Sequence, residues 1–418
     1  MEVQRGLSLA DATQAVLRNI APLSVESVSV MAAVGRALAE GVLSPIDLPA
    51  WNNSGMDGYA VRRADVLGAS AANPMVLPVI ATIMAGGSFT ETIAANTCVR
   101  IMTGAPIPPG ADAVVRVEDT DRGVQSVRIT NDRDVRTPLG NIRARGEDVR
   151  NGDMVFAAGT SIGPVHVGVL ASVGAASVRV HRAPRVLLVS TGDELVDVEQ
   201  FDQVLAGRRI ISSTSYALPL WLTDCGAVVR ALPLLPDKLH AIRDAISTAL
   251  DDGCDLLITT GGVSVGAHDY TRDALQALGA DFAFWRARIR PGGPIGVGTV
   301  RGIPWLGLPG NPVSTMVTAE LFARPLLRRL GGHAEISTLR VRVRLSEAMI
   351  GGGGLTHLLR VVVTRAGDGD FEARLAGRQG SNLLRTLALA NALAVVPEDR
   401  ESAQAGEYLD AILIGDVR

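Results

Sequence analysis

The chain has almost no lysine and little cysteine. Its 418 residues include 40 Lys+Arg, and Lys238 is the only lysine among them, a skew that reflects codon composition more than chemistry. Cys98, Cys225 and Cys254 lie far apart and form no CxxC pair. This spacing argues against a disulfide framework and against a zinc site, and it fits a reducing compartment.

No block of like charge is present, the net charge is −3, and the sequence pI is near 6.1. These values argue against a nucleic-acid partner. The N-terminus lacks a basic segment followed by an apolar core, so we expect no secretory signal. The longest uncharged run, residues 154–178, contains four glycines and a proline. It therefore predicts a packed helix flanked by turns rather than a membrane span, and a cytoplasmic protein without a membrane partner.

The pattern of apolar residues divides the chain into regions with helix-like and regions with strand-like periodicity. Ser8 is a candidate N-cap for a helix over residues 9–20, and a second helix is expected over residues 31–39. Short β-type runs follow at residues 75–83, 99–102, 113–117 and 127–130. Strands and helices alternate from residue 184, and β-type runs return after residue 331.

This order of helix-like and strand-like segments predicts a multidomain α/β protein. Its centre is a doubly wound, parallel α/β domain at residues 182–332, because alternating strands and helices form such sheets. A β-rich inserted domain is expected at residues 47–142, and a C-terminal β-barrel domain at residues 333–418. Residues 1–46 and 143–181 are expected to form a discontinuous helical and mixed linker domain.

Three glycine-containing loops follow strands of the predicted α/β domain: "STGDEL" (190–195), "TTGGVSVGAHDY" (259–270) and "LPGNPVS" (308–314). Ligands of open α/β sheets bind at the carboxyl ends of the strands. Glycine allows backbone N–H groups to point at an anion, and helix N-termini add partial positive charge. The three loops together therefore predict a cradle for a phosphate-bearing ligand.

Each loop by itself also fits an ordinary turn, because Gly and Ser commonly cap helices. Neither a GxxxxGK[ST] motif nor a GxGxxG motif after a strand is present, so a P-loop and a nicotinamide site have little support. The acids in these loops are Asp193, Glu194 and Asp269. Carboxylates beside phosphates suit Mg²⁺. Asp269 alternatively caps a helix, and Asp193 alternatively occupies a turn.

These loops, in this order, resemble the molybdopterin molybdenumtransferase family of the MoeA type, and they are similar to the E domain of gephyrin. The resemblance extends over "NNSGMDGYAVR" (52–62), "RIMTGAPIPPGADAVV" (100–115), "RARGEDV" (143–149), the three loops above and "GRQGSN" (377–382). The motifs reach from the second predicted domain to the last, and this makes the resemblance far more specific than any single motif.

The resemblance implies an L-shaped homodimer of four-domain subunits. It implies a reaction in which adenylylated molybdopterin and molybdate give molybdenum cofactor and AMP, assisted by Mg²⁺. Expected partners are a molybdopterin adenylyltransferase and the molybdoenzyme apoproteins or their chaperones. The family pattern also suggests that the site is completed across the dimer, with Asp57 and Thr103 facing Asp269 of the other chain.

Site residues carry over by position in these motifs. Catalytic roles are implied for Asp57, Thr103, Asp148, Glu194 and Asp269, of which Glu194 and Asp269 are the metal ligands. Molybdate is a dianion and needs arginine and hydroxyl donors, which suggests Arg143, Arg360 and Ser381. The further substrate-binding candidates are Thr191, Gly192, Thr260, Gly261, Gly262, Ser264, Gly266, Arg290, Pro309, Gly310, Asn311, Pro312 and Ser314.

The chain departs from the family pattern at two places. Family members usually have two lysines in a KPGKP stretch, where this chain has Arg290 and Gly293. An acid and an amide usually found near residue 212 are also missing, and Ser212 stands there. A joint loss is tolerable if the two charges were paired. The alternative is a diverged paralogue that binds molybdopterin or its molybdenum form with little or no transfer, as a carrier, insertase or regulator. A scaffold of the gephyrin kind has no further support.

Overall fold

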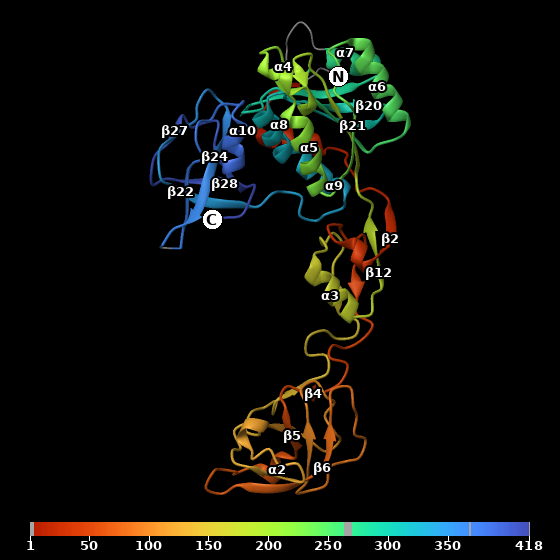
Figure 1. Ribbon diagram of the computed structural model, residues 1–418, viewed down its shortest axis with the longest axis vertical. Helices are drawn as coiled ribbons and strands as arrows, with labels where there is room; N and C mark the ends of the chain where they lie inside the picture. Colours follow the sequence, from red (N-terminus) through yellow and green to blue (C-terminus); the bar gives the residue numbers. More distant parts are fainter. Residues whose placement is uncertain (1–3, 263–269, 368, 418) are drawn as a thin grey trace.

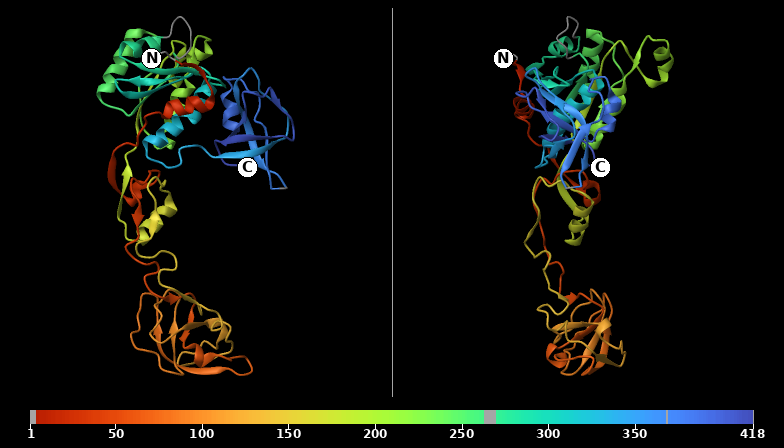
Figure 2. Two further views of the ribbon diagram at one scale, coloured as in Figure 1. Left: turned by 180° about the vertical axis from the view of Figure 1, so that it is seen from behind. Right: turned by 90° about the vertical axis from the view of Figure 1, so that its left-hand side faces the viewer.

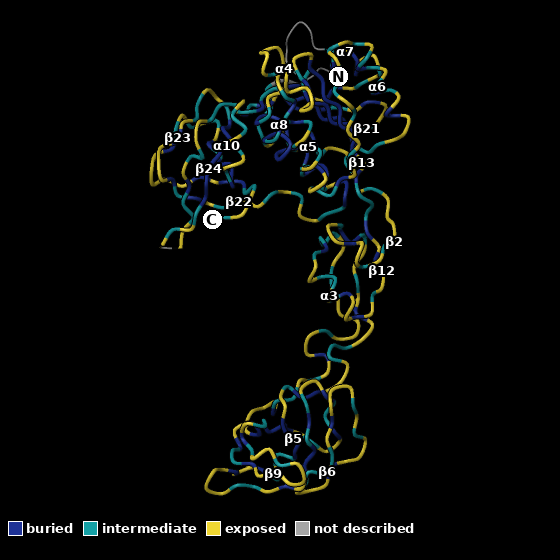
Figure 3. The backbone as a smooth tube through the Cα atoms, viewed as in Figure 1, coloured by how far each residue is buried: buried dark blue, intermediate teal, exposed yellow. Residues whose placement is uncertain are grey.

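The computed structural model describes residues 4–262, 270–367 and 369–417. The chain forms an elongated molecule (Figures 1 and 2). An α/β unit and a barrel unit lie side by side at one end, a linker unit lies below the α/β unit, and a β-rich unit occupies the far end. Buried residues concentrate inside each unit, and the segments between the linker and β-rich units are largely exposed (Figure 3).

A seven-stranded sheet forms the α/β unit, with the order β1-β18-β20-β21-β17-β13-β16. All neighbours are parallel except those of β20, which is antiparallel to both β18 and β21. The sequence predicted a wholly parallel sheet, and this prediction is wrong at β20. The cause is a two-residue hairpin turn at Arg301 and Gly302, whose φ angles of 51° and 79° suit the twist of a tight hairpin. The strands are β1 (Gln4–Leu7), β13 (Arg185–Ser190), β16 (Val228–Ala231), β17 (Leu256–Thr260), β18 (Asp281–Ala287), β20 (Gly296–Val300) and β21 (Ile303–Leu308).

Helices cover both faces of this sheet, as a doubly wound fold requires. Alternation along β13 illustrates the reason: Val186 and Leu188 pack in one apolar core, and Leu187 and Val189 pack in the other. The first core contains side chains from α1 (Leu9–Leu17), α5 (Ser213–Asp224), α8 (Pro312–Thr318) and α9 (Arg324–Leu330). The second contains side chains from α6 (Leu239–Asp251) and α7 (Tyr270–Ala277).

Residues 4–17 pack with the α/β unit rather than with the linker unit, which corrects the expected placement of this part of residues 1–46. β1 pairs with β18 at the sheet edge, and Ala12 and Val16 of α1 enter the first core. Ser8 caps α1 as expected, because its hydroxyl accepts a hydrogen bond from the Asp11 N–H at 3.1 Å.

Two antiparallel strand pairs and one helix make up the linker unit. β2 (Val25–Ser29) pairs with β12 (Ser177–His181), β3 (Val42–Leu43) pairs with β11 (Met154–Phe156), and α3 spans Pro164–Ser172. The helix expected over residues 31–39 is only a 3₁₀ turn at Val30–Ala33, because Gly35 takes a φ of 82° and ends it. Within the described parts of the chain, no helix is long and apolar enough to cross a membrane.

The β-rich unit contains the strands expected from the sequence in a sheet of order β8-β5-β7-β6-β9. β5, which carries the motif glycine Gly58, was not anticipated. A side chain at Gly58 would lie 2.0 Å from the Val115 carbonyl oxygen, so this glycine is required by strand packing. The strands are β5 (Gly58–Val61), β6 (Met75–Ile83), β7 (Cys98–Ile101), β8 (Ala113–Arg116) and β9 (Ser126–Ile129); β4 (Asn53–Ser54) pairs with β10 (Ile142–Arg143), and the short α2 spans Arg63–Val66.

A closed β-barrel forms the C-terminal unit. The sheet order β24-β25-β22-β28-β26 is closed by a pairing of β26 with β24, and β19 (Ile289–Arg290) of the preceding segment adds to β24. Alternate side chains of β24, including Leu359, Val361 and Val363, fill the barrel interior. The strands are β22 (Arg340–Leu345), β23 (Met349–Ile350), β24 (Thr356–Arg365), β25 (Phe371–Leu375), β26 (Ala392–Val396), β27 (Ser402–Ala403) and β28 (Tyr408–Leu413), and the helix α10 spans Leu384–Leu389.

Candidate active site

Three neighbouring parallel strands place the predicted loops at one edge of the sheet. In the register of the sheet, Ser190 at the end of β13 pairs with Thr260 of β17, and Thr260 pairs with Leu308 of β21. The Thr260 hydroxyl donates to the Ser190 hydroxyl at 2.9 Å. The Gly261 N–H donates to the Leu308 carbonyl at 3.2 Å. The loops that begin at these residues therefore start from adjacent points.

Gly261 and Gly310 make this close approach possible. Gly261 has a φ of 83°, and a side chain there would lie 2.9 Å from the Thr191 carbonyl oxygen. A side chain at Gly310 would lie 3.6 Å from the Cα atom of Gly261. Gly262 also has a positive φ, and Gly192 follows the buried Thr191. The loops thus come together as an anion cradle requires, while Ser264, Gly266 and Asp269 lie outside the described residues.

The two acids of the first loop differ in their surroundings. Asp193 and Asp237 each accept a hydrogen bond from the other's backbone N–H, at 3.1 and 3.2 Å, so Asp193 has a structural role in the turn. Glu194 is exposed, and its carboxylate has no hydrogen bond or ion pair with the part of the chain that the structure describes. Glu194 is therefore the acid of this loop that is free to bind a cation.

The helix α8 begins at this edge and meets the barrel unit. Asn311 is at the N-cap position and Pro312 is the first helical residue, as expected, although the Asn311 side chain makes no capping hydrogen bond. The Val313 N–H donates to the Ser381 carbonyl at 3.2 Å. Ser314, the next residue of α8, is buried. The Thr315 hydroxyl donates a hydrogen bond to the Pro309 carbonyl. The loop that carries Ser381 is thereby joined to the helix that follows Gly310.

Arg360 is a fully buried arginine on β24. Its Nη2 atom donates to the carbonyl oxygens of Arg378 and Gly380, at 2.9 and 3.1 Å. Its Nε and Nη1 atoms have no hydrogen-bond partner among the described residues. Burial lowers the pKa of the Arg360 guanidinium from its ordinary value. Unpaired buried guanidinium N–H groups are costly, and they indicate a site for an anion beside the Ser381 loop.

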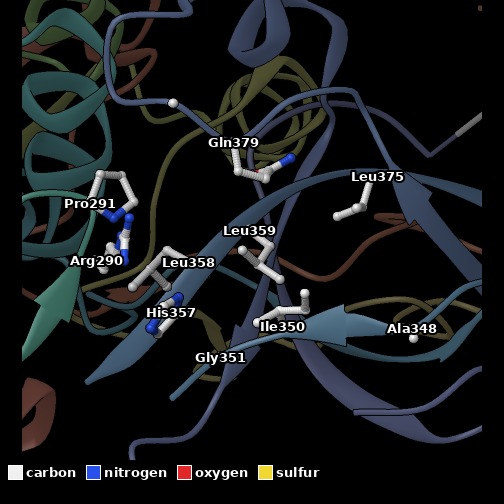
Figure 4. Close-up of a pocket in the computed structure, with 11 residues that line it drawn as sticks. Arg290, Pro291, Ala348, Ile350, Gly351, His357, Leu358, Leu359, Leu375 and Gln379 are labelled. Atoms are coloured by element: carbon white, nitrogen blue, oxygen red, sulfur yellow. The ribbon is translucent and has the colours of Figure 1, made fainter. Parts of the chain in front are cut away.

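Arg290 lies where the α/β unit meets the barrel. β19 pairs with β24 so that Arg290 is level with His357. Arg290 and His357 both line a cavity of about 420 Å³, together with Gln379 (Figure 4). Sequence reasoning identified Arg290 but missed Gln379 and His357. Gln379 could have been found from its position inside the "GRQGSN" motif, whereas no signal marks His357.

The remaining predicted residues lie at the opposite end of the molecule, in and near the β-rich unit (Figure 1). Asp57 accepts hydrogen bonds from the backbone N–H and the hydroxyl of Thr103, both at 2.7 Å. These bonds, the backbone one first, hold the pKa of Asp57 below its usual range. Arg143 is exposed beside Gly55 and lines a second cavity of about 540 Å³. Asp148 is exposed on the connecting segment.

The predicted residues therefore form two groups. Thr191, Glu194, Thr260 and the α8 loop lie at the sheet edge, and Arg290, Arg360 and Ser381 lie at the adjoining barrel. Asp57, Thr103 and Arg143 lie together in and beside the β-rich unit. One chain does not bring the two groups together (Figure 1).

The fold is that of a multidomain α/β protein in which the sheet-edge loops of the α/β unit adjoin a β-barrel unit. The family models that match are the MoeA N-terminal region (domain I and II) over residues 7–174, a probable molybdopterin binding domain over residues 187–329, and the MoeA C-terminal region (domain IV) over residues 342–414. Together they cover most of the chain in the order of the observed units.

Curated relatives have similar lengths. Molybdopterin molybdenumtransferase 2 of Mycobacterium tuberculosis is 38% identical over 385 residues, which is 90% of this chain and 92% of the relative. The molybdopterin molybdenumtransferase of Haemophilus influenzae is 34% identical over 92% of this chain and 93% of its own length. A crystal structure of a molybdopterin biosynthesis MoeA protein from Pyrococcus horikoshii OT3 is 26% identical, with a TM-score of 0.82, over 98% of this chain and 100% of that one. The chain belongs to the MoeA family.

Proposed function

We propose that this protein is a molybdopterin molybdenumtransferase that takes adenylylated molybdopterin and molybdate and releases molybdenum cofactor and AMP. The observation that carries the proposal is full-length similarity to relatives that bear the transferase name. The convergence of the three glycine loops at one sheet edge supports it, because such an edge suits the phosphates of the pterin substrate.

Molybdate would bind at Arg360 and Ser381. The Nε and Nη1 atoms of Arg360 are buried and have no partner in the described part of the chain, and N–H donors of this kind suit a tetrahedral oxyanion. Ser381 is joined to the first turn of α8 through Val313, so the barrel loop and the sheet-edge loop are held together. Arg290 would contribute positive charge from the adjacent strand.

Mg²⁺ fits this site through Glu194 and the phosphates of the substrate. Mg²⁺ usually keeps several waters and takes only one or two protein carboxylates, so a single free, exposed glutamate suffices. Among the residues that the structure describes, no group of three or more potential metal ligands is present. The bound metal would neutralise charge on the phosphoanhydride, and Glu194 would hold it in position.

A homodimer would bring the two groups of site residues together. The linker unit exposes several apolar side chains that a partner subunit would cover, including Met31 at 75%, Leu43 at 57%, Met154 at 61% and Val165 at 80%. In such a dimer, Asp57, Thr103, Arg143 and Asp148 of one chain would complete the sheet edge of the other. The physiological setting would be the cytoplasm, with a molybdopterin adenylyltransferase upstream and molybdoenzyme apoproteins or their chaperones downstream.

The relatives named above bear the transferase name, and the comparisons give no support to a binding-only paralogue. The decisive assay supplies purified protein with adenylylated molybdopterin, Mg²⁺ and molybdate and measures AMP. We expect molybdate-dependent AMP release that falls at least about 100-fold in Glu194→Ala, the order expected for loss of an electrostatic contact at a reacting phosphate. Equal release by both proteins would refute the proposal.

A further inference from the structure

An open cavity of about 540 Å³ lies in the β-rich unit. Its wall includes Met56, the residue before Asp57, and Arg143 of β10. The Gly55 N–H donates to the Asn141 carbonyl oxygen at 2.7 Å, and this bond joins the segment that leads to Asp57 to the segment that carries Arg143. The cavity therefore adjoins the site residues at this end of the molecule.

Apolar side chains form part of the wall, and a fixed loop carries one of them. Met56 is 39% exposed and Leu139 is 64% exposed, and both line the cavity. The Arg63 guanidinium donates to the carbonyl oxygens of Thr137 and Pro138, at 2.6 and 2.9 Å. Because the loop is held at two carbonyl groups, the position of Leu139 is defined before any ligand binds. Aliphatic walls of this kind suit a flat, largely apolar ring.

One positive and one negative side chain, Arg143 and Glu147, line the same cavity. Both are exposed, and neither forms an ion pair with a residue that the structure describes. One oxygen of the Glu147 carboxylate accepts from the Ala144 N–H at 2.9 Å, which orients the carboxylate and leaves its other lone pairs for a ligand. The cavity thus offers a ligand an acceptor group and a donor group that do not neutralise each other.

These charges select among possible ligands. Molybdate is a dianion, and in this cavity it would lie close to the Glu147 carboxylate. Adenine has no two adjacent donors to offer a carboxylate. The pyrimidine edge of a pterin has an amino group and a ring N–H side by side, followed by a carbonyl oxygen. A carboxylate can accept from both donors while a guanidinium donates to the carbonyl.

We propose that this cavity binds the pterin ring of the substrate, with the Glu147 carboxylate on the amino group and ring N–H and Arg143 on the ring carbonyl. Met56 and Leu139 would cover the faces of the ring. Guanine has the same edge, and the choice of a pterin rests on the proposed function. In the proposed dimer, the phosphates of one substrate molecule lie at the sheet edge of one subunit and its pterin ring in this cavity of the other. Glu147 then determines specificity for the pterin.

Calorimetry of the full-length protein with biopterin, lumazine, guanosine and adenosine tests this site without turnover. Lumazine has a carbonyl in place of the amino group of the pterin, so it keeps the ring and loses one donor. We expect biopterin to bind at least about 10-fold more tightly than lumazine and adenosine, because a hydrogen bond to a charged group is lost in both. Guanosine should bind less tightly than biopterin. Its ribose lies on the side of the amino group, whereas the side chain of biopterin lies at the opposite corner of the ring.

Two variants test the assigned contacts. Glu147→Gln can still accept from the Ala144 N–H but loses an acceptor for the ligand, so the preference for biopterin over lumazine should disappear. Arg143→Met removes the donor to the ring carbonyl and should weaken biopterin binding at least about 5-fold. The matched controls are Glu91→Gln and Arg128→Met, at exposed residues of the same unit outside the cavity, and they should bind biopterin as the wild type does.

Several outcomes would overturn the inference. These are absence of biopterin binding, equal affinity for biopterin and lumazine, tighter binding of guanosine than of biopterin, and an unchanged preference in Glu147→Gln. The thermal midpoint of each variant identifies misfolding, and Glu147→Ala replaces Glu147→Gln if that variant fails to fold. Selective biopterin binding by a protein that releases no AMP would refute the proposed function alone. Molybdate-dependent AMP release by a protein without selective biopterin binding would refute this inference alone.

Discussion

The side-chain amide of Gln379 bonds both backbone polar groups of Arg360. Its Oε1 atom accepts from the Arg360 N–H at 2.8 Å, and its Nε2 atom donates to the Arg360 carbonyl at 3.1 Å. Nε2 also donates to the Gly377 carbonyl at 2.7 Å. One side chain therefore takes the place of a neighbouring strand and fixes the loop of residues 377–381 against β24. Gln379 is in this way a positioning residue for Arg360 and Ser381.

Replacing Gln379 by Met should loosen this loop while the barrel remains folded. Three hydrogen bonds are lost, each worth about 1 kcal/mol net, and the Arg360 N–H is left unpaired, whereas the Arg360 carbonyl keeps its hydrogen bond from the Ala376 N–H. We expect the KM for molybdate to rise at least about 10-fold, with a smaller change in kcat, because the lost interactions position a binding group rather than a reacting one. Steady-state kinetics with varied molybdate measures the split.

The matched control is Gln404→Met, which removes an exposed glutamine of the same barrel that bonds Ser402. It should leave both constants unchanged. Gln379→Asn keeps an amide on a shorter side chain. A low KM for molybdate in this variant counts as rescue only if calorimetry also shows that molybdate binding is restored. An unchanged molybdate KM in Gln379→Met would show that Arg360 does not depend on this amide.

Gly293 and Ser212 allow a test of the two departures from the family pattern. A side chain at Gly293 would lie 3.2 Å from the Ile289 carbonyl oxygen, so a lysine there needs only a small backbone shift. Ser212 is buried at the N-terminus of α5, and its hydroxyl bonds Ser215 at 2.6 Å. If the missing lysine and acid formed a pair, Gly293→Lys with Ser212→Asp should raise transferase activity more than the two single changes combined.

A double-mutant cycle on kcat/KM measures this coupling. We expect a coupling energy of at least about 0.5 kcal/mol, the lower end for groups in contact. Ala206→Lys, at an exposed residue of the same unit, controls for added charge. Additive effects would show that the two losses arose independently.

Much of the fold was predictable because local patterns decide it. β6 spans the predicted residues 75–83. The sheet edge was also predictable, since the carboxyl ends of parallel strands meet at one edge. Family motifs supplied the functional residues that physical reasoning alone would have read as turns, such as Asp57.

Other features depend on tertiary contacts that the sequence does not reveal. α1 joins the α/β unit through the pairing of β1 with β18, which is 274 or more residues distant in the chain. The antiparallel β20 depends on positive φ at Arg301, a residue that rarely takes this conformation. The orphaned nitrogens of Arg360 follow from burial in the folded barrel.

His333 should make stability depend on pH. It lies at the junction of the linker and α/β units, where its Nδ1 atom bonds the Ser161 hydroxyl at 2.6 Å. Burial, then the charges of Arg328 and His181, lower its pKa to about 4. Between about pH 6.5 and 4 the unfolded chain binds more protons at this site than the folded one, so the free energy of unfolding falls as the pH falls.

Chemical denaturation of the wild type and of His333→Asn measures this contribution. The neutral asparagine should remove a pH-dependent loss of at most about 3 kcal/mol over that window, since each pKa unit corresponds to about 1.4 kcal/mol. His240→Asn, at an exposed histidine, should keep the wild-type dependence. Parallel curves for wild type and His333→Asn would show that this histidine does not titrate as described.

Mixing two inactive variants tests whether the site is shared between subunits. Asp57 directly precedes β5 of the β-rich unit, and Glu194 follows β13 of the α/β unit. These two units lie at opposite ends of the molecule (Figure 1), so a shared site takes one residue from each subunit. We expect Asp57→Ala and Glu194→Ala each to lack activity alone. After the subunits are exchanged, half of the dimers are mixed and each mixed dimer has one intact site, so activity should recover to about a quarter of the wild-type value.

Two mixtures separate this explanation from others. Glu194→Ala mixed with Thr260→Ala should stay inactive, because both changes fall at one sheet edge and every site then carries at least one of them. Asp57→Ala mixed with Thr103→Ala should stay inactive for the same reason, since these two residues are hydrogen-bonded to each other. Light scattering tests whether the chain is a dimer, and mixing of differently tagged chains tests whether subunits exchange. Dimers of Asp57→Ala with Glu194→Ala that remain inactive after exchange would contradict the shared site. Each chain would then have to bring its own Asp57 and Glu194 together. The separation of the two units within one chain makes that arrangement unfavourable.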